Sequence, residues 1–180
     1  MRKLFLKIVE LIDKKIVRHS NWLYIPHAKE QVLYVAPHIY RGKEKGLPDG
    51  TIIKRGDFLA EIHIDNQKIR NMDLSFKDIV TIFKDELDSL AYAVGKDSKF
   101  IDIKAFHGKT LLYPLLKREG FMIIDINSIL NSFFVELWER ILETVYSRKY
   151  SNKRRKKRKM KEFWITNDQL VDRMRSRTNL

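Results

Sequence analysis

The stretch Leu47–Ile69, which reads LPDGTIIKRGDFLAEIHIDNQKI, decides the fold expected for this chain. Asp49-Gly50 and Lys54–Asp57 predict two tight turns around a short strand at 51–53, because glycine accepts the positive φ angles that such turns require. The residues that follow alternate with the period of a strand whose one face lies in a core. Apolar side chains mark one face, Phe58, Ala60, Ile62 and Ile64, and a mainly polar stripe marks the other, Asp57, Leu59, Glu61, His63 and Asp65.

The chain before this stretch predicts one helix and one strand. Residues 2–17 space their apolar side chains as an amphipathic helix does, with lysines opposite, and either pack on the protein or lie on a lipid surface. Residues 22–26 are a short extended connection. Val32–Tyr40 is rich in β-branched and aromatic residues and predicts a strand, and 41–46 is a charged loop.

The second half predicts alternating helices and strands. Its clearest element is a helix over Ser75–Val94, where Ser75 and Asp78 form a capping-box pattern and Gly95 marks the end. This order of elements predicts an α+β fold with one mixed β-sheet packed against helices, in a single domain over 1–180. The other expected elements are a strand at 100–106, a turn at 107–110, a helix at 111–119, strands at 121–126 and 162–165, a long helix at 128–148, and a final helix capped by Thr166 and Gln169.

The positive charge of the chain is concentrated in one segment. The net charge is +13, but Arg148–Lys161 holds ten Lys or Arg residues and no acid, so the remainder carries 13 − 10 = +3. Three interpretations stay open: a solvated loop, a surface that binds anionic phospholipid, or a non-specific grip on nucleic acid phosphates. Specific nucleic-acid recognition is not expected, because no row of aromatic residues accompanies the charge. The candidate polyanion-binding residues are Lys153, Arg154, Arg155, Lys156, Lys157, Arg158 and Lys159.

Composition excludes several classes of protein. At 180 residues and 44% hydrophobic content, the chain is long enough and apolar enough for one folded domain. It has no cysteine, so disulfides and cysteine-ligated zinc are excluded. The first residues lack the pattern of a signal peptide, and no apolar run has the length of a membrane span. We therefore expect a cytoplasmic protein, either free or peripheral to a membrane.

A first candidate site lies on the polar stripe. His63 and Asp65 are two residues apart on the expected strand and point the same way, and His107 joins them if a neighbouring strand brings it near. The three side chains are suited to binding a metal of unknown identity or to general acid–base catalysis. Two plainer interpretations stay open: a solvent-facing strand with ordinary polar residues, or Asp65 and Asn66 capping the strand end.

A second candidate site is the sequence His107-Gly108-Lys109-Thr110. If this segment links a strand to a helix, the amides of Gly108, Lys109 and Thr110 would bind an anion at the helix start. The plainer interpretation is a turn in which Thr110 caps the helix. The segment is not a Walker A loop, because position 103 is Ile103 where that motif requires glycine.

Three segments together resemble the YkoP-like domain family: LPDGTIIKRGDFLAEIHIDN, DIKAFHGKTLLYPLLKREGF and EFWITNDQL, at 47–66, 102–121 and 162–170. The family comprises small bacterial proteins and C-terminal domains of polysaccharide deacetylases, so the resemblance implies a cell-envelope polysaccharide context. It implies no catalytic residue and no cofactor. The metal-binding motif of the deacetylases, a Thr-Phe-Asp-Asp-Gly-Pro-like run, is absent here.

The expected function is an accessory or ligand-binding domain linked to envelope polysaccharide metabolism. Its expected partners are envelope polysaccharide enzymes and an anionic membrane surface or another polyanion. The first alternative is a hydrolase or transferase acting on sugars or phosphorylated substrates through His63, Asp65 and His107. The second is a non-specific nucleic-acid-binding protein that uses the basic run.

Overall fold

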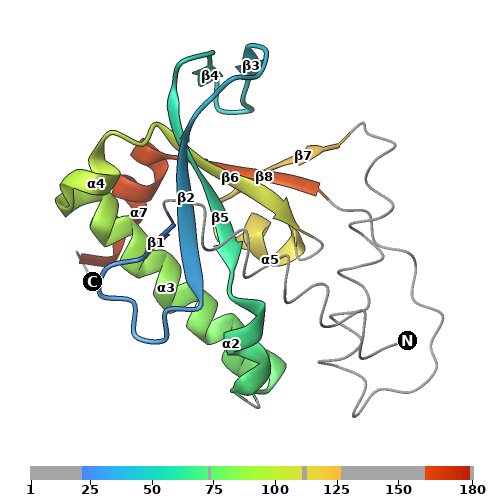
Figure 1. Cartoon of the computed structure of the whole chain (residues 1–180), viewed down its shortest axis with the longest axis vertical. Helices are drawn as coiled ribbons and strands as arrows, with labels where there is room; N and C mark the ends of the chain where they lie inside the picture. The colour runs from blue at the N-terminus through green and yellow to red at the C-terminus, as the bar shows by residue number, and fades with distance from the viewer. Residues whose placement is uncertain (1–21, 73, 111–112, 127–160, 179–180) are drawn as a thin grey trace.

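The computed structural model describes residues 22–72, 74–110, 113–126 and 161–178 (Figure 1). The helices expected at 2–17 and 128–148, and most of the basic run at 148–161, lie outside these residues.

A six-stranded mixed sheet forms the centre of the fold, in the order β1-β2-β5-β6-β8-β7. All neighbouring strands pair antiparallel except β5 and β6, which pair parallel. The expected α+β class with one mixed sheet is therefore confirmed. The strands are β1 (Leu23–Tyr24), β2 (Leu33–Ile39), β5 (Phe58–Ile64), β6 (Ala105–Thr110), β7 (Met122–Asp125) and β8 (Lys161–Thr166).

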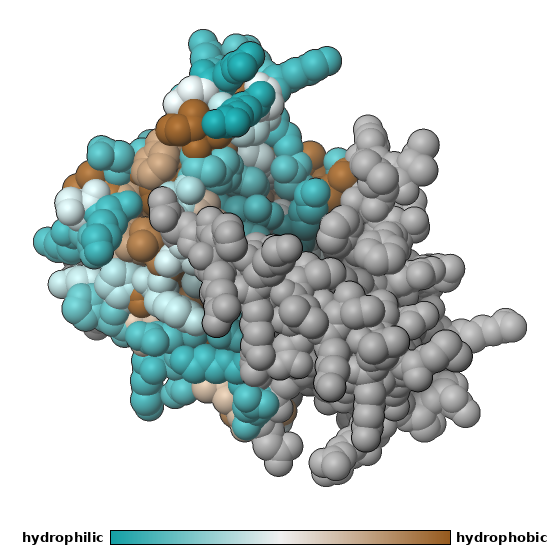
Figure 2. All heavy atoms as spheres, in the orientation of Figure 1, coloured by the Kyte–Doolittle hydropathy of each residue, from teal (hydrophilic) through white to brown (hydrophobic). Residues whose placement is uncertain are grey.

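A small hairpin of β3 (Lys45–Gly46) and β4 (Ile52–Ile53) projects beyond one end of the sheet (Figure 1). The two turns expected around it are present, because Gly50 and Gly56 have φ angles of 88° and 99°. Figure 2 shows a mostly hydrophilic described surface on this side of the molecule, with small hydrophobic patches near the hairpin.

Helices pack against one face of the sheet. The longest, α3 (Phe76–Lys96), begins with the expected capping box of Ser75 and Asp78, and α7 (Asn167–Thr178) packs beside it. The cap expected for α7 is also present: the amide of Thr166 donates to Gln169 Oε1 at 3.0 Å, and the Gln169 amide donates to Thr166 Oγ1 at 3.3 Å. The short helices are α2 (Asn66–Asn71), α4 (Ser98–Ile101) and α5 (Tyr113–Arg118). Among the described residues, no helix combines the length and the apolar character needed to cross a membrane.

The main core lies between the sheet and α3, α7 and α5. Leu87 and Leu90 of α3 are fully buried against sheet residues such as Val35 and Phe106. A second, smaller core lies on the opposite face beneath the hairpin. It is formed by Leu47, Ile53, Leu59, Ala105 and Trp164.

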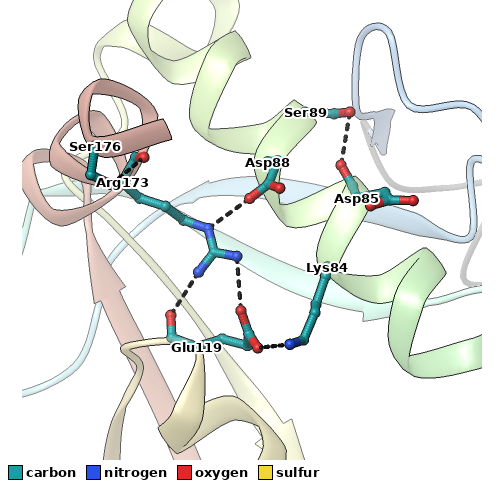
Figure 3. Close-up of polar contacts among 7 residues, drawn as sticks. All are labelled: Lys84, Asp85, Asp88, Ser89, Glu119, Arg173 and Ser176. Atoms are coloured by element: carbon teal, nitrogen blue, oxygen red, sulfur yellow. Dashed lines mark hydrogen bonds and ion pairs between the residues drawn. The ribbon is translucent and has the colours of Figure 1, made fainter. Parts of the chain in front are cut away.

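Charged side chains join α3 to α7 and to the end of α5 (Figure 3). Arg173 Nε lies 2.9 Å from Asp88 Oδ1, and its two Nη atoms bond the carbonyl oxygen and Oε2 of Glu119 at 3.0 and 2.8 Å. Lys84 Nζ lies 3.0 Å from the other carboxylate oxygen of Glu119. We call these four residues, Lys84, Asp88, Glu119 and Arg173, the Arg173 cluster.

Three expectations about local structure were wrong. The charged loop expected at 41–46 ends in β3. The segment expected as a strand at 100–106 begins with the last two residues of α4, and β6 begins only at Ala105. The turn expected at 107–110 is formed by the last four residues of β6. Gly108 is required there by packing: a Cβ atom would lie 2.5 Å from the ring of Phe163 and 3.0 Å from the Ile62 carbonyl oxygen.

The end of α3 also differs from expectation. The helix continues through Gly95 to Lys96. Gly95 lies where α7 approaches α3, since a Cβ atom there would meet the sulfur of Met174 at 3.1 Å. The glycine therefore reflects contact between two helices, and the backbone of Asp97 ends the helix instead.

Candidate functional site

The sheet face opposite α3 carries a row of rings with one carboxylate near its middle. Register places these side chains together: Tyr34 pairs with His63, Glu61 with His107, and His107 with Trp164. The row therefore crosses β2, β5, β6 and β8 in the middle of the sheet. We call seven residues the aromatic–histidine band: Trp22, Tyr34, His38, Glu61, His63, His107 and Trp164.

One end of the band is a group of parallel rings. Trp22, directly before β1, stacks on Tyr34 with ring centroids 4.2 Å apart and an interplanar angle of 19°. His63 lies nearly parallel to both, with its centroid 5.3 Å from each. Tyr24 meets Tyr34 edge-on and is 49% exposed. The rings therefore form a partly exposed aromatic platform at the edge of the sheet.

Glu61 is the acid of the band. Its carboxylate Oε2 lies 3.5 Å from His63 Nε2, and 40% of its side chain is exposed. The hydrogen bond from His63 lowers the pKa of Glu61, assisted by the positive potential of neighbouring groups that include Lys109, although burial opposes this shift. Glu61 is therefore a carboxylate at neutral pH and accepts hydrogen bonds.

His38 and His107 meet across β5, with their Nε2 atoms 3.3 Å apart. His38 Nδ1 lies 3.1 Å from the carbonyl oxygen of Ala36, which only accepts, so we assign the Nδ1 proton to His38. Burial, with a smaller contribution from His38, lowers the pKa of His107 to about 4. In the neutral pair His107 Nε2 then donates to His38 Nε2, which leaves His107 Nδ1 as an acceptor.

Trp164 forms the buried end of the band. Its ring stacks on His107 with centroids 4.6 Å apart, and it is only 1% exposed. Lys45, which forms an ion pair with Glu162, lies with Nζ 4.8 Å from the centroid of the Trp164 ring. The indole Nε1 is buried and has no hydrogen-bond partner within the described part of the chain. A buried donor without a partner is rare in folded proteins and calls for an explanation.

The structure places two residues of the first predicted site on the band and the third at a helix cap. His63 and His107 both lie on the band but contact different partners. Asp65 follows the end of β5 and caps α2, where its Oδ1 accepts from the Lys68 amide at 2.9 Å. Within the residues that the structure describes, no three His, Asp or Glu side chains are grouped to hold a metal ion. The capping interpretation of Asp65 is therefore the one its contacts support.

The second predicted site loses its geometric basis. Gly108, Lys109 and Thr110 lie inside β6, where they pair with residues of β8. Their amides therefore do not form the free start of a helix, on which the anion-binding hypothesis depended. Lys109 is exposed on the same face as His107. The polyanion-binding candidates at 153–159 lie outside the described residues.

Five members of the band, Trp22, Tyr34, His38, Glu61 and Trp164, were not among the predicted site residues. Alternation along the strand expected at 32–40 places Tyr34 and His38 on one face, so the sequence contained a signal for His38. It contained no signal that this face would meet His107, because β2 and β6 are not neighbours in the sheet and β5 lies between them.

Comparison with known proteins assigns the chain to a protein family. The family model described as the YkoP domain matches residues 2–174. The chain is also similar to the uncharacterized protein YkoP of Bacillus subtilis (strain 168), with 26% identity over 131 residues, which cover 69% of this chain and 72% of that protein. No solved structure matches the chain. The resemblance seen in the three sequence segments is thus confirmed for the YkoP domain.

Proposed function

The chain belongs to the YkoP domain family, and from that premise we propose that it is a saccharide-binding accessory domain in the metabolism of cell-envelope polysaccharide. The observation that carries the proposal is the partly exposed platform of Trp22, Tyr34 and His63 beside the carboxylate of Glu61. The link to envelope polysaccharide comes from the family resemblance and belongs to the proposal.

The platform suits the apolar side of a sugar ring. Each pyranose has a flat face of C–H bonds, and aromatic side chains offer a large rigid apolar surface with a polar edge. Tyr24, which is 49% exposed, extends this surface beyond Tyr34. A chain of sugar rings would lie along the row from Tyr24 towards His63.

The polar atoms beside the platform suit sugar hydroxyl groups. Glu61 accepts hydrogen bonds through two oxygens; its carboxylate contacts His63, and its side chain remains 40% exposed. A ligand site that combines an apolar surface with a few fixed polar groups is the usual arrangement for small molecules. The platform would therefore supply affinity and Glu61 would supply orientation.

Calorimetric titration of the full chain with soluble neutral, N-acylated and uronic-acid oligosaccharides tests this function. We expect at least one class to bind, and Trp22→Ala to weaken its binding by about tenfold or more, which is about 1.4 kcal/mol. Tyr92→Ala is the matched control, because Tyr92 is a similarly exposed aromatic residue on α3, away from the band. No binding by any class, or an equal loss in Tyr92→Ala, would overturn the proposal.

A second candidate is an enzyme that acts on the same sugars. The observation favouring it is that His107, held neutral with a pKa of about 4, lies beside both Glu61 and His38. In this enzyme proposal Glu61 replaces Asp65 in the predicted set of His63, Asp65 and His107. Asp65 caps a helix, and Glu61 is the acid that contacts His63. Prolonged incubation with the oligosaccharides that bind would distinguish the two, since a binding domain returns them unchanged.

The basic run and the N-terminal segment carry the remaining proposals. Attachment to the cytoplasmic membrane surface through 153–159 predicts salt-sensitive binding to anionic vesicles, and binding to nucleic acid predicts the same for DNA. Comparing vesicles with DNA at equal ionic strength separates these two proposals. Neither depends on the saccharide site.

A further inference from the structure

The contact between His38 and His107 has the dimensions of a metal site. Their Nε2 atoms lie 3.3 Å apart, which is longer than the separation of about 2.9–3.0 Å typical of an N–H hydrogen bond. Two imidazole nitrogens that bind one tetrahedral metal ion at about 2.0–2.1 Å are separated by about 3.3–3.4 Å. The separation therefore fits two ligands of one ion better than a donor and its acceptor.

The ring centroids support the same interpretation. The centroids of His38 and His107 are 5.1 Å apart. If both ring axes converge on one ion at the bond lengths above, the centroids should be about 5.2 Å apart, whereas rings in line along a hydrogen bond of this length would place them about 5.6 Å apart. The rings are inclined at 79°, so they approach a shared point without stacking on each other.

A second contact also fixes the orientation of each imidazole. His38 Nδ1 donates to the carbonyl oxygen of Ala36 at 3.1 Å, and its Nε2 faces His107. Metal-binding histidines commonly give their second ring nitrogen to a backbone carbonyl in this way. His107 is fixed by its stacking on the fully buried Trp164. Both rings are therefore oriented before any ion binds.

Glu61 is placed to complete the ligand set. It lies on β5, the strand between those of His38 and His107, and its Cα is the register partner of His107. In the described residues no three such side chains yet converge, and the carboxylate lies 3.5 Å from His63 instead. Because 40% of the Glu61 side chain is exposed, it has room to turn from His63 towards the imidazoles.

We propose that His38 and His107 bind one divalent first-row transition metal ion through their Nε2 atoms, with Glu61 as a third ligand and water at the open position. Two imidazoles and one carboxylate suit Zn²⁺ or Fe²⁺ and disfavour Mg²⁺ and Ca²⁺, which prefer oxygen ligands. This site goes beyond saccharide binding, because its main evidence is the contact between His38 on β2 and His107 on β6, which are not part of the aromatic platform. Glu61 is the one residue named in both proposals.

The test uses the full chain without an affinity tag, first freed of metal with a chelator. Calorimetric titration with Zn²⁺ should show one ion per chain, and Co²⁺ should produce the visible absorption bands of a protein-bound ion. His38→Ala and His107→Ala should each weaken Zn²⁺ binding by about tenfold or more, and Glu61→Gln by less. His27→Gln is the matched control, since His27 lies on a loop against Tyr92.

Two outcomes would overturn the proposal. One is the absence of Zn²⁺ and Co²⁺ binding by the wild-type chain. The other is binding that both His38→Ala and His107→Ala leave unchanged, because the ion would then lie elsewhere. If an alanine variant fails to fold by circular dichroism, the glutamine variant at the same position replaces it. Saccharide titration of the chelator-treated chain runs in parallel, so failure of the metal site and failure of the saccharide function give separate results.

Discussion

The Arg173 cluster lies among the helices beside the sheet and the aromatic–histidine band lies on the sheet face opposite α3, and the two groups differ in how their polar atoms are paired. In the Arg173 cluster every charge faces an opposite one. Arg173 and Glu119 are only 14% and 7% exposed, and Asp88 and Lys84 complete the pairing (Figure 3). In the band, His107 contacts a second histidine, and the Trp164 donor has no partner among the described residues.

The pKa shifts express this difference. Burial alone would raise the pKa of Glu119, but hydrogen bonds from Arg173 and Lys84 outweigh it and lower the pKa, so the carboxylate is stabilised. At His107 the neighbouring carboxylates do not outweigh burial, and the pKa falls to about 4. Charges that are each paired with an opposite charge indicate a structural role. Polar groups at a partly exposed face that are not paired in this way indicate a ligand site.

The largest expected effect comes from opening the Arg173 cluster. Arg173→Met should lower the free energy of unfolding by about 3–5 kcal/mol, because Glu119 and Asp88 then lose their main partner at a largely buried site. Urea unfolding followed by circular dichroism measures this. Arg175→Met is the control: its side chain is 70% exposed, so the change should be below about 0.5 kcal/mol. A loss below about 1 kcal/mol in Arg173→Met would show that the cluster is not structural.

The pH dependence of stability is the next largest effect, measured in chelator-treated protein. The pKa of His107 is about 4 in the folded chain and 6.5 when unfolded, so between these values the unfolded chain binds more protons. Stability from neutral His107 is therefore complete above pH 6.5 and is lost as the pH falls towards 4. The loss should be about 2–3 kcal/mol.

The variant His107→Gln isolates this contribution. Acid also protonates carboxylates, so the difference between wild type and variant, obtained from urea unfolding at pH 7, 5.5 and 4, is the relevant quantity. If the free energy of unfolding depends on pH identically in both proteins, the pKa of His107 is not lowered by folding. The contrast drawn between the Arg173 cluster and the aromatic–histidine band would then be wrong.

The smallest effect compares two glutamates. Glu61→Gln should change the free energy of unfolding by less than about 0.5 kcal/mol, because the side chain is 40% exposed and its ion pair with His63 is long. Glu119→Gln should cost about 2 kcal/mol or more, since it weakens two charge-assisted bonds at a buried site. Equal costs for the two variants would argue that Glu61 serves the fold as well.

Features that depend on neighbours in the sequence were predicted well. The strand at β5, the capping boxes of α3 and α7, and the turns at Gly50 and Gly56 each arise from alternation or from a few adjacent residues. These signals are local because backbone preference and capping act within one turn or a few strand residues.

The errors arose where distant contacts decide the structure. The helix α4 has four residues, too few to display helical periodicity, and it starts from a cap at Asp97. Gly108 looks like a turn residue, but its role is set by the ring of Phe163 on another strand. His63 was found from its place on the polar face of an alternating strand, and His107 was added as a residue that a neighbouring strand could bring near. The contacts of His63 with Trp22 and of His107 with His38 could not be predicted, because no local pattern specifies the order of strands in a sheet.

The parallel pairing of β5 and β6 has a consequence for how the chain folds. A parallel pair cannot be joined by a hairpin, and the crossover from Ile64 to Ala105 contains α2, α3 and α4. The capped helix α3 can form early from local contacts, whereas β5–β6 and β6–β8 must close long loops, which slows folding. Glu61, His107 and Trp164 meet only after these closures, so ligand capacity is acquired late. A half-folded chain would contain the helix but no site.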